Sequence, residues 1–217
     1  MIDPVEVAER VHVVRSSIEK AGGVGVALIA VTKTFGVEAI FAARDAGCDG
    51  VGENYAQELL AKIEEGIPPI DVHFIGAVQS NKVRQLAGHV SLWQSIDRES
   101  LIVELGKRAP GARILLQVDT TGEPTKGGVD PSGLDALVQS AQTVGVQVDG
   151  LMTIGPTSGD RDECVKAFSL LRSLVDTYGL RTCSMGMSDD YELAVSCGST
   201  MVRVGSRLFG TRPFLAH

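Results

Sequence analysis

The sequence predicts one domain built as a closed barrel of eight parallel strands that alternate with helices, with an extra helix in front. Three observations support this prediction. Short apolar runs occur eight times along the 217 residues, amphipathic stretches separate them, and polar residues or glycines follow nearly every run. Strands that alternate with helices are typical of parallel sheets, and eight repeats are the number found in a (β/α)8 barrel. An open doubly wound sheet is the alternative, because it needs fewer strands.

The expected elements follow one another in a regular order. An amphipathic helix comes first, over Pro4–Ala21, with Asp3 as its N-cap and the glycines 22–23 as its stop. Apolar strands are then expected at Val26–Thr32, Gly50–Gly52, Val72–Ile75, Ser91–Ser95, Arg113–Val118, Gly150–Thr153, Thr182–Met185 and Met201–Val204. Helices are expected between them at Val37–Ala46, Ala56–Glu65, Lys82–Leu86, Glu99–Arg108, Pro131–Val144, Asp162–Tyr178 and Asp189–Ser196. The longest polar gap, 122–128, has the length of a loop at a barrel mouth, so we expect a single domain over residues 1–217.

The composition excludes several classes of protein. A net charge of −7 with no basic stripe argues against nucleic-acid binding. The four cysteines and four histidines lack the paired short spacings of a metal site or a disulfide framework. The N-terminus lacks the features of a signal peptide, and the longest apolar stretch is too short to span a bilayer. We therefore expect a cytoplasmic protein with no metal, membrane or nucleic-acid partner. We also expect a monomer, because no long exposed apolar stripe is evident.

Lys33 is the residue that best indicates the chemistry of the site. It follows seven uncharged residues, 26–32, that are typical of a buried parallel strand, so it is expected at the C-terminal end of the first strand. Active sites of such barrels gather at that end of the strands. A lysine held against apolar walls loses its proton more readily and can form an imine with an aldehyde. The alternative is a strand-end lysine whose ammonium reaches water.

The ends of the last two strands predict an anion site. Gly205 and Ser206 lead into a short helical stretch, and Ser184 ends the neighbouring strand. The loops after strands 7 and 8 of such barrels often bind phosphate through backbone N–H groups at a helix N-terminus. Ser188 is a further hydroxyl here, and the alternative for it is ordinary helix capping. We expect this anion site to lie across the barrel from Lys33.

Two polar side chains are candidates for contact with the ring of a ligand. Arg203 lies inside its strand, where alternation points it to the side opposite Val202 and Val204, and if that side is the barrel mouth it is a fixed cation close to the site. The alternative is an arginine that pairs with an acid between the barrel and the helices. Asn54 either donates its amide to a ring substituent or caps the following helix. Glu53 is a candidate to hold a lysine or arginine in place.

An aldehyde-reactive lysine, an anion site and an arginine between them suit one ligand well. Pyridoxal 5′-phosphate (PLP) carries an aldehyde, a phosphate and a ring nitrogen in about that arrangement. A sugar phosphate bound directly by a Schiff-base aldolase is a more distant alternative.

Motifs along almost the full chain carry a resemblance to a known family. They are Ala30-Val31-Thr32-Lys33-Thr34, Gly52-Glu53-Asn54-Tyr55, His73-Phe74-Ile75-Gly76 with Gln79-Ser80-Asn81-Lys82, Gly150-Leu151-Met152-Thr153-Ile154, Ser184-Met185-Gly186-Met187-Ser188-Asp189, and Val202-Arg203-Val204-Gly205 with Phe209-Gly210. These motifs resemble the pyridoxal phosphate homeostasis proteins, also called the proline synthetase co-transcribed homologues. The resemblance implies a modified barrel like the N-terminal domain of alanine racemase, with PLP held as a Schiff base on Lys33. It also implies the other cofactor-binding residues, with Arg203 facing the pyridine nitrogen, Ser184, Gly205 and Ser206 holding the phosphate, and Asn54 nearby. One departure is visible, because the family usually has histidine in the third-strand loop, where this chain has Ala77.

The resemblance favours a carrier over an enzyme, and two features of the chain agree with it. The chain ends at His217, soon after the last strand, so we expect no second domain that would supply a catalytic tyrosine. An arginine at the ring nitrogen stays protonated and does not readily give the ring a proton, which makes PLP a poorer electron sink. We therefore expect a protein of intracellular vitamin B6 homeostasis that carries or buffers PLP for apo-enzymes. The alternative is a weak fold-type III PLP enzyme, such as an amino-acid racemase.

Overall fold

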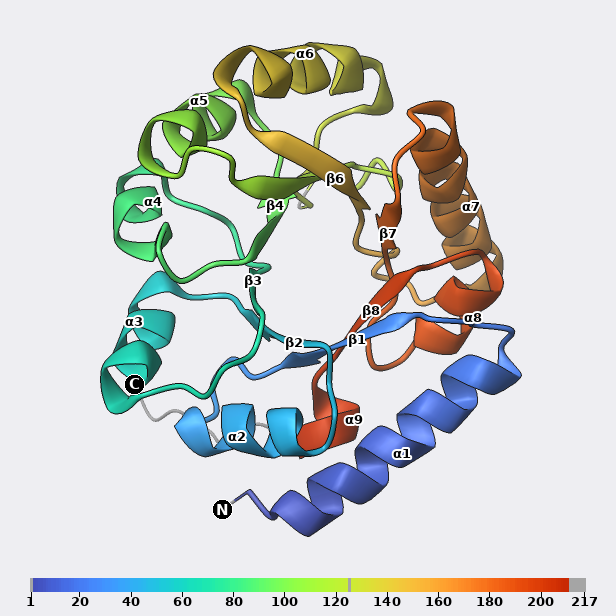
Figure 1. Cartoon of the computed structure of the whole chain (residues 1–217). Coiled ribbons are helices and arrows are strands. Elements are labelled where there is room, and N and C mark those ends of the chain that lie inside the picture. Colours follow the sequence, from blue (N-terminus) through green and yellow to red (C-terminus); the bar gives the residue numbers. More distant parts are fainter. Residues whose placement is uncertain (1, 125, 211–217) are drawn as a thin grey trace.

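A computed structural model describes residues 2–124 and 126–210, and its strands form a closed barrel (Figure 1). Each strand pairs in parallel with the next, and the last pairs with the first through Leu28 opposite Val202 and Ala30 opposite Val204. This closure confirms the barrel prediction and rules out the open sheet. The strands are β1 (Ala27–Val31), β2 (Gly50–Glu53), β3 (Val72–Phe74), β4 (Leu92–Ile96), β5 (Arg113–Gln117), β6 (Gln147–Met152), β7 (Thr182–Ser184) and β8 (Met201–Val204).

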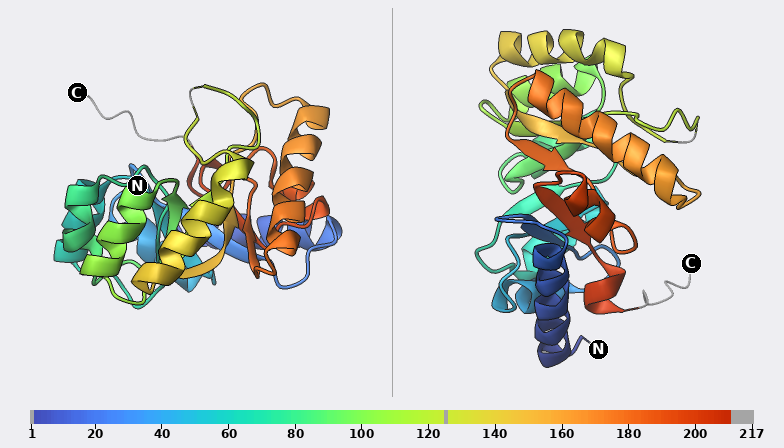
Figure 2. Two further views of the ribbon diagram at one scale, coloured as in Figure 1. Left: turned by 90° about the horizontal axis from the view of Figure 1, so that it is seen from above. Right: turned by 90° about the vertical axis from the view of Figure 1, so that its right-hand side faces the viewer.

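Helices surround the barrel in chain order (Figures 1 and 2). They are α1 (Pro4–Lys20), α2 (Val37–Asp45), α3 (Ala56–Glu65), α4 (Ser80–Leu86), α5 (Glu99–Arg108), α6 (Leu134–Val144), α7 (Arg161–Thr177), α8 (Tyr191–Ser196) and α9 (Ser206–Phe209). The extra helix α1 packs against α2, α8 and α9, and Asp3 caps it by accepting a hydrogen bond from the backbone N–H of Val5 at 2.9 Å. Within residues 2–124 and 126–210, no helix has the length and apolar character needed to cross a membrane.

Two hydrophobic clusters divide the core because side chains of a strand point alternately to its two faces. The larger cluster lies between the barrel and its helices and includes Leu28, Ala30 and Val202. The smaller one is formed by strand residues of the opposite face, inside the barrel: Ile29, Leu92, Leu115, Met152 and Met201. The rest of the interior holds buried polar side chains, which matter for the site described below.

Some observed element bounds differ from the predicted ones, among them the starts of β6 and α8. β6 begins at Gln147, three residues before the predicted start at Gly150, because Gln147 pairs with Arg113 of β5. The exposed ends of these strands are joined by an ion pair of 2.6 Å between Arg113 and Asp149. α8 begins at Tyr191 and not at Asp189. Such polar strand ends carry no apolar signal, so the pattern of the sequence could not reveal them.

Gly150 offers a test of how closely the strands pack. A Cβ atom at this position would overlap the backbone carbonyl oxygen of Thr182 in β7, so β6 and β7 would have to separate. We expect Gly150→Ala to lower the free energy of unfolding by about 2–3 kcal/mol, the usual cost of overpacking. The measurement is chemical denaturation. Gly88→Ala is the matched control, because nothing lies within 4 Å of a Cβ there, and equal stability of the two variants would contradict the close packing.

Candidate functional site at the C-terminal mouth of the barrel

A cavity of about 270 Å³ opens at the C-terminal ends of the strands. It is lined by Val31, Lys33, Asn54, Ile75, Met152, Ile154, Met187, Ser188, Asp189, Arg203, Gly205 and Ser206. The cavity therefore brings together most of the side chains that the sequence singled out. Ser184 does not line it, and Ala77 is an exposed residue outside it.

Lys33 and Gly205 follow the C-terminal ends of two neighbouring strands, β1 and β8. β8 pairs with β1, and a Cβ atom at position 205 would lie 3.3 Å from both the side chain and the carbonyl oxygen of Val31. The absence of a side chain at Gly205 therefore leaves room for this close approach. Gly205 and Ser206 thus lie on the same side of the cavity as β1, and the expectation that they lie across the barrel from Lys33 was wrong. The first and last strands are distant in sequence, but barrel closure makes them adjacent.

Arg203 points into the barrel, which is one of the two orientations that the sequence left open. Only 4% of its surface is exposed, and its guanidinium donates to the Ser184 hydroxyl at 2.6 Å and to the Thr153 carbonyl at 2.8 Å. Both acceptors are uncharged, in contrast to the alternative in which this arginine pairs with an acid. Burial lowers the pKa of Arg203 to about 10, so the group keeps its positive charge at neutral pH. The cavity therefore has a fixed cation in its wall.

A chain of hydrogen bonds continues from Arg203 through the barrel interior. Ser184 donates to Gln94 Oε1 at 2.7 Å, and Gln94 Nε2 lies 2.7 Å from His73 Nδ1. A guanidinium only donates, so Ser184 accepts from Arg203 and uses its own proton toward Gln94. The Gln94 amide nitrogen then donates to Nδ1, which requires a His73 without a proton on that nitrogen. The direction of every bond in the chain follows from the charge of the arginine.

Burial agrees with this assignment of His73. Loss of solvent lowers the pKa of His73 to about 4, with the nearby carboxylate of Asp71 acting in the opposite direction. The imidazole is therefore neutral at physiological pH. Neither Gln94 nor His73 was predicted as part of the site, although a glutamine within the apolar run of β4 was a visible signal.

Glu53 holds a lysine in place, as the sequence suggested, and that lysine is Lys62 of α3. The Lys62 ammonium lies 2.6 Å from Glu53 Oε1, and both side chains are buried. Glu53 also accepts from the Thr32 hydroxyl at 2.6 Å. Burial raises the pKa of Glu53, and the charge of Lys62 opposes that shift. Lys62 was not predicted from the sequence, although Glu58 four residues earlier on the same helix indicates an ion pair.

The structure excludes helix capping, one of the alternatives left open for Asn54 and Ser188. α3 begins at Ala56 with Tyr55 as its N-cap, so Asn54 does not cap it. The Asn54 side chain lines the cavity instead, and its buried Oδ1 has no hydrogen-bond partner among the described residues. Ser188 does not cap α8, because its hydroxyl accepts from the Gly205 N–H at 3.2 Å. Ser188 therefore links the loop after β7 to the loop after β8.

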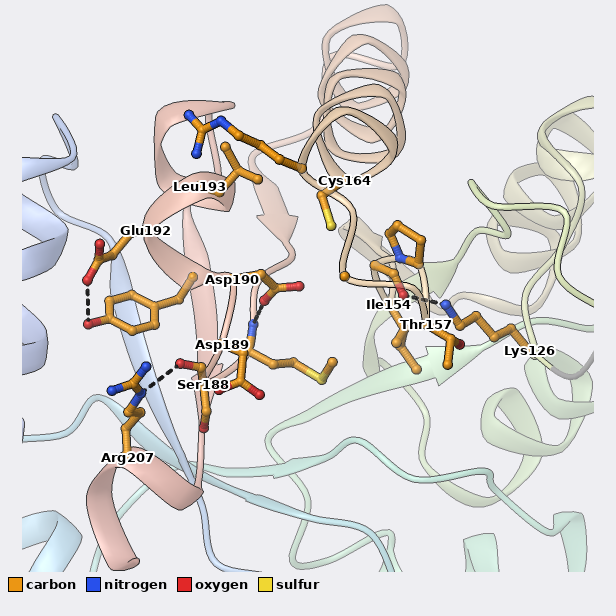
Figure 3. Close-up of a pocket in the computed structure, with 16 residues that line it drawn as sticks. Lys126, Ile154, Thr157, Cys164, Ser188, Asp189, Asp190, Glu192, Leu193 and Arg207 are labelled. Carbon is orange, nitrogen blue, oxygen red and sulfur yellow. Dashed lines mark hydrogen bonds between the residues drawn. The ribbon is translucent and has the colours of Figure 1, made fainter.

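A larger cavity of about 640 Å³ adjoins the first one and shares Ile154, Met187, Ser188 and Asp189 with it (Figure 3). Arg207 donates to the Ser188 carbonyl at 3.2 Å, and Asp190 accepts from the Met187 N–H at 2.5 Å. These two hydrogen bonds hold the loop of Met187, Ser188 and Asp189, which lines both cavities. Lys126 on the far wall and Arg207 line this cavity together with Asp189, Asp190 and Glu192, so it contains both positive and negative groups.

Comparison with known proteins places this fold and site in a class. The family model of the alanine racemase N-terminal domain matches residues 2–213. An alanine racemase from Corynebacterium glutamicum superposes with a TM-score of 0.76 at 19% identity, covering 100% of this chain and 64% of that chain. At that identity the likeness concerns the fold alone.

More similar proteins define the family. The pyridoxal phosphate homeostasis protein of Pseudomonas aeruginosa is 40% identical over 197 residues, which are 87% of this chain and 86% of that protein. PipY of Synechococcus elongatus, solved with PLP bound, has a TM-score of 0.81 and 35% identity, and the match covers 94% of this chain and 100% of that one. This chain belongs to the family of pyridoxal phosphate homeostasis proteins.

The buried histidine predicts a pH dependence of stability. The pKa of His73 is about 4 in the folded protein against 6.5 ordinarily, so between these values the unfolded chain binds more protons. The free energy of unfolding should therefore rise as pH rises from about 4 to 6.5, by at most about 3 kcal/mol from this residue, and stay level above. Denaturation of wild type and His73→Gln across this range measures the effect.

The control for this prediction is His12→Gln, because His12 is exposed on α1. This variant should keep the slope of the wild type, whereas His73→Gln should flatten it. Equal slopes in all three proteins would show that His73 does not remain neutral in the fold.

Proposed function

We propose that this protein binds PLP in the cavity at the barrel mouth, as a Schiff base on Lys33, and acts in intracellular vitamin B6 homeostasis. In this role it carries or buffers the cofactor and supplies apo-enzymes. The observation that carries the proposal is the convergence of Lys33, Asn54, Arg203 and the Gly205-Ser206 turn on one cavity. The names of its relatives and the PLP bound to PipY support it. We also propose that the protein works as a cytoplasmic monomer.

The residues of the cavity fit the chemical groups of PLP. When bound, PLP supplies an aldehyde, whose carbon condenses with the Lys33 amine with loss of one water molecule. The buried Asn54 Oδ1 has no partner among the described residues and can accept a hydrogen bond from a ring hydroxyl. Arg203 contributes a fixed positive charge. Gly205 and Ser206 stand in the wall beside Lys33, where backbone and hydroxyl donors suit an anionic group.

Ser184 as a phosphate ligand stays a prediction, and the geometry favours another role for it. Its side chain is fully buried, and its hydroxyl is used by Arg203 and Gln94. We propose that Ser184 orients the guanidinium of Arg203. Ser188, which lines the cavity, is the hydroxyl nearer to the candidate anion site.

Replacement of Lys33 tests the proposal directly. Wild-type protein mixed with PLP and reduced with borohydride should gain one phosphopyridoxyl group on the peptide that contains Lys33, detected by mass spectrometry. Lys33→Ala should gain none and lose the imine absorbance, while its free energy of unfolding stays within about 0.5 kcal/mol of wild type, as expected at a strand end outside the core. An adduct on another lysine would refute the assignment.

Lys82→Ala is the matched control for this experiment, because Lys82 lies in α4 and does not line the cavity. It should gain the same adduct as wild type. A reduced adduct with the mass of a sugar phosphate, and not of PLP, would favour the aldolase alternative.

A weak amino-acid racemase is the second candidate, because alanine racemases share the fold. Two features favour the carrier. The charged Arg203 gives a bound ring little ability to draw electrons, and none of the three tyrosines lines the cavity of Lys33. We expect exchange of the α-proton of D- and L-alanine in D2O, followed by NMR, to be no faster with the PLP-loaded protein than with free PLP. Exchange well above that rate would establish the enzyme.

A further inference from the structure

One buried ion cluster fixes the backbone on both sides of Lys33. We define the Lys62 cluster as Glu53, Glu58 and Lys62. On the N-terminal side of Lys33, Thr32 is held twice, because its hydroxyl donates to Glu53 at 2.6 Å and its carbonyl accepts from Lys62 at 2.9 Å. The last residue before the lysine therefore has little freedom to move.

On the C-terminal side, the cluster holds an unusual backbone conformation. Thr34 has φ +69°, and among the described residues it is the only one other than glycine with a positive φ. This left-handed conformation costs about 1–2 kcal/mol for an ordinary residue and is rare for a β-branched one. The Thr34 N–H donates to Glu58 Oε1 at 2.6 Å. Glu58 thus stabilises a turn that threonine does not favour.

Lys62 joins the two sides into one unit. Its ammonium lies 2.6 Å from Glu53 Oε1, 2.7 Å from Glu58 Oε1 and 2.9 Å from the Thr32 carbonyl. An ammonium has three donors, and all three are used here. Lys62 is therefore a structural cation. Lys33, in contrast, lines the cavity.

We propose that Glu58 is a positioning residue for Lys33. Through the Thr34 N–H it holds the left-handed turn that directs Lys33 into the cavity, and the rest of the Lys62 cluster holds Glu58. This inference rests on the proposed role of Lys33 as the covalent anchor of PLP. The cluster lies outside the cavity lining, so we expect it to affect the rate of imine formation at Lys33 and not the contacts with the ligand.

Two substitutions of Glu58 test the role of its acceptor oxygen. Stopped-flow absorbance measures the rate of imine formation with PLP. Glu58→Ala removes the acceptor and should slow the reaction about tenfold, the factor that corresponds to one hydrogen bond to a charged group. Glu58→Gln keeps an amide oxygen for the Thr34 N–H and should stay within about threefold of wild type, since a neutral acceptor binds less strongly. Glu64→Ala, an exposed site on the same helix, should match wild type.

A double-mutant cycle tests whether the effect passes through Thr34. Glycine adopts positive φ about as readily as negative φ, so Thr34→Gly should form the turn without the hydrogen bond to Glu58. In that background Glu58→Ala should slow imine formation by only about twofold, well below its effect in wild type. An equal loss in both backgrounds would overturn the inference.

Hydrogen exchange in the protein without PLP gives an independent measure. The Thr34 amide should exchange faster in Glu58→Ala than in Glu58→Gln, while amides of β5 keep their protection. Unchanged exchange at Thr34, or an unchanged reaction rate in Glu58→Ala, overturns the inference. If Glu58→Ala does not fold, Glu58→Met removes the acceptor at similar length. Absence of any adduct on Lys33 in wild type instead refutes the proposed function, and the positioning role with it.

Discussion

Closure of the barrel by the pairing of β8 with β1 is the constraint on which the rest of the site depends. It makes Ala30 a neighbour of Val204, although they are far apart in the chain. Lys33 and Gly205 follow these two strands, so the amine and the glycine turn open into one cavity. The same pairing places Arg203 opposite Ile29, which fixes its direction into the interior. Without closure, these groups would stand at opposite edges of a sheet.

Two buried cations flank the cavity, and they differ in what balances their charge. Lys62 is paired with the carboxylates of Glu53 and Glu58, so its positive charge is offset by two adjacent acidic groups. Among the described residues, the hydrogen bonds of Arg203 go to the uncharged oxygens of a hydroxyl and a carbonyl, and its pKa of about 10 keeps it protonated. Arg203 therefore contributes a positive charge to the cavity wall that no directly bonded carboxylate offsets among the described residues. In a low-dielectric interior, such a charge favours an anionic ligand more strongly than it would in water.

Local patterns in the sequence predicted much of the fold and part of the site. The seven uncharged residues before Lys33 located it at a strand end, and the alternation of β8 placed Arg203 on the face opposite Val202 and Val204. The two roles of Asn54 were indistinguishable in the sequence, because both require the same residue at the same place. Gln94 was missed because its partner Ser184 is 90 residues away. Lys62 was missed because a lysine on an amphipathic helix usually faces solvent, and burial depends on acids from another element.

The hydrogen bonds that hold Arg203, Thr32 and Thr34 are all made within the protein itself. A molecule that enters the cavity meets groups that are already ordered, so little conformational entropy is left to lose on capture. Under the proposed function, release of the aldehyde would then depend on how fast water hydrolyses its bond to the Lys33 amine, with no rearrangement of these residues.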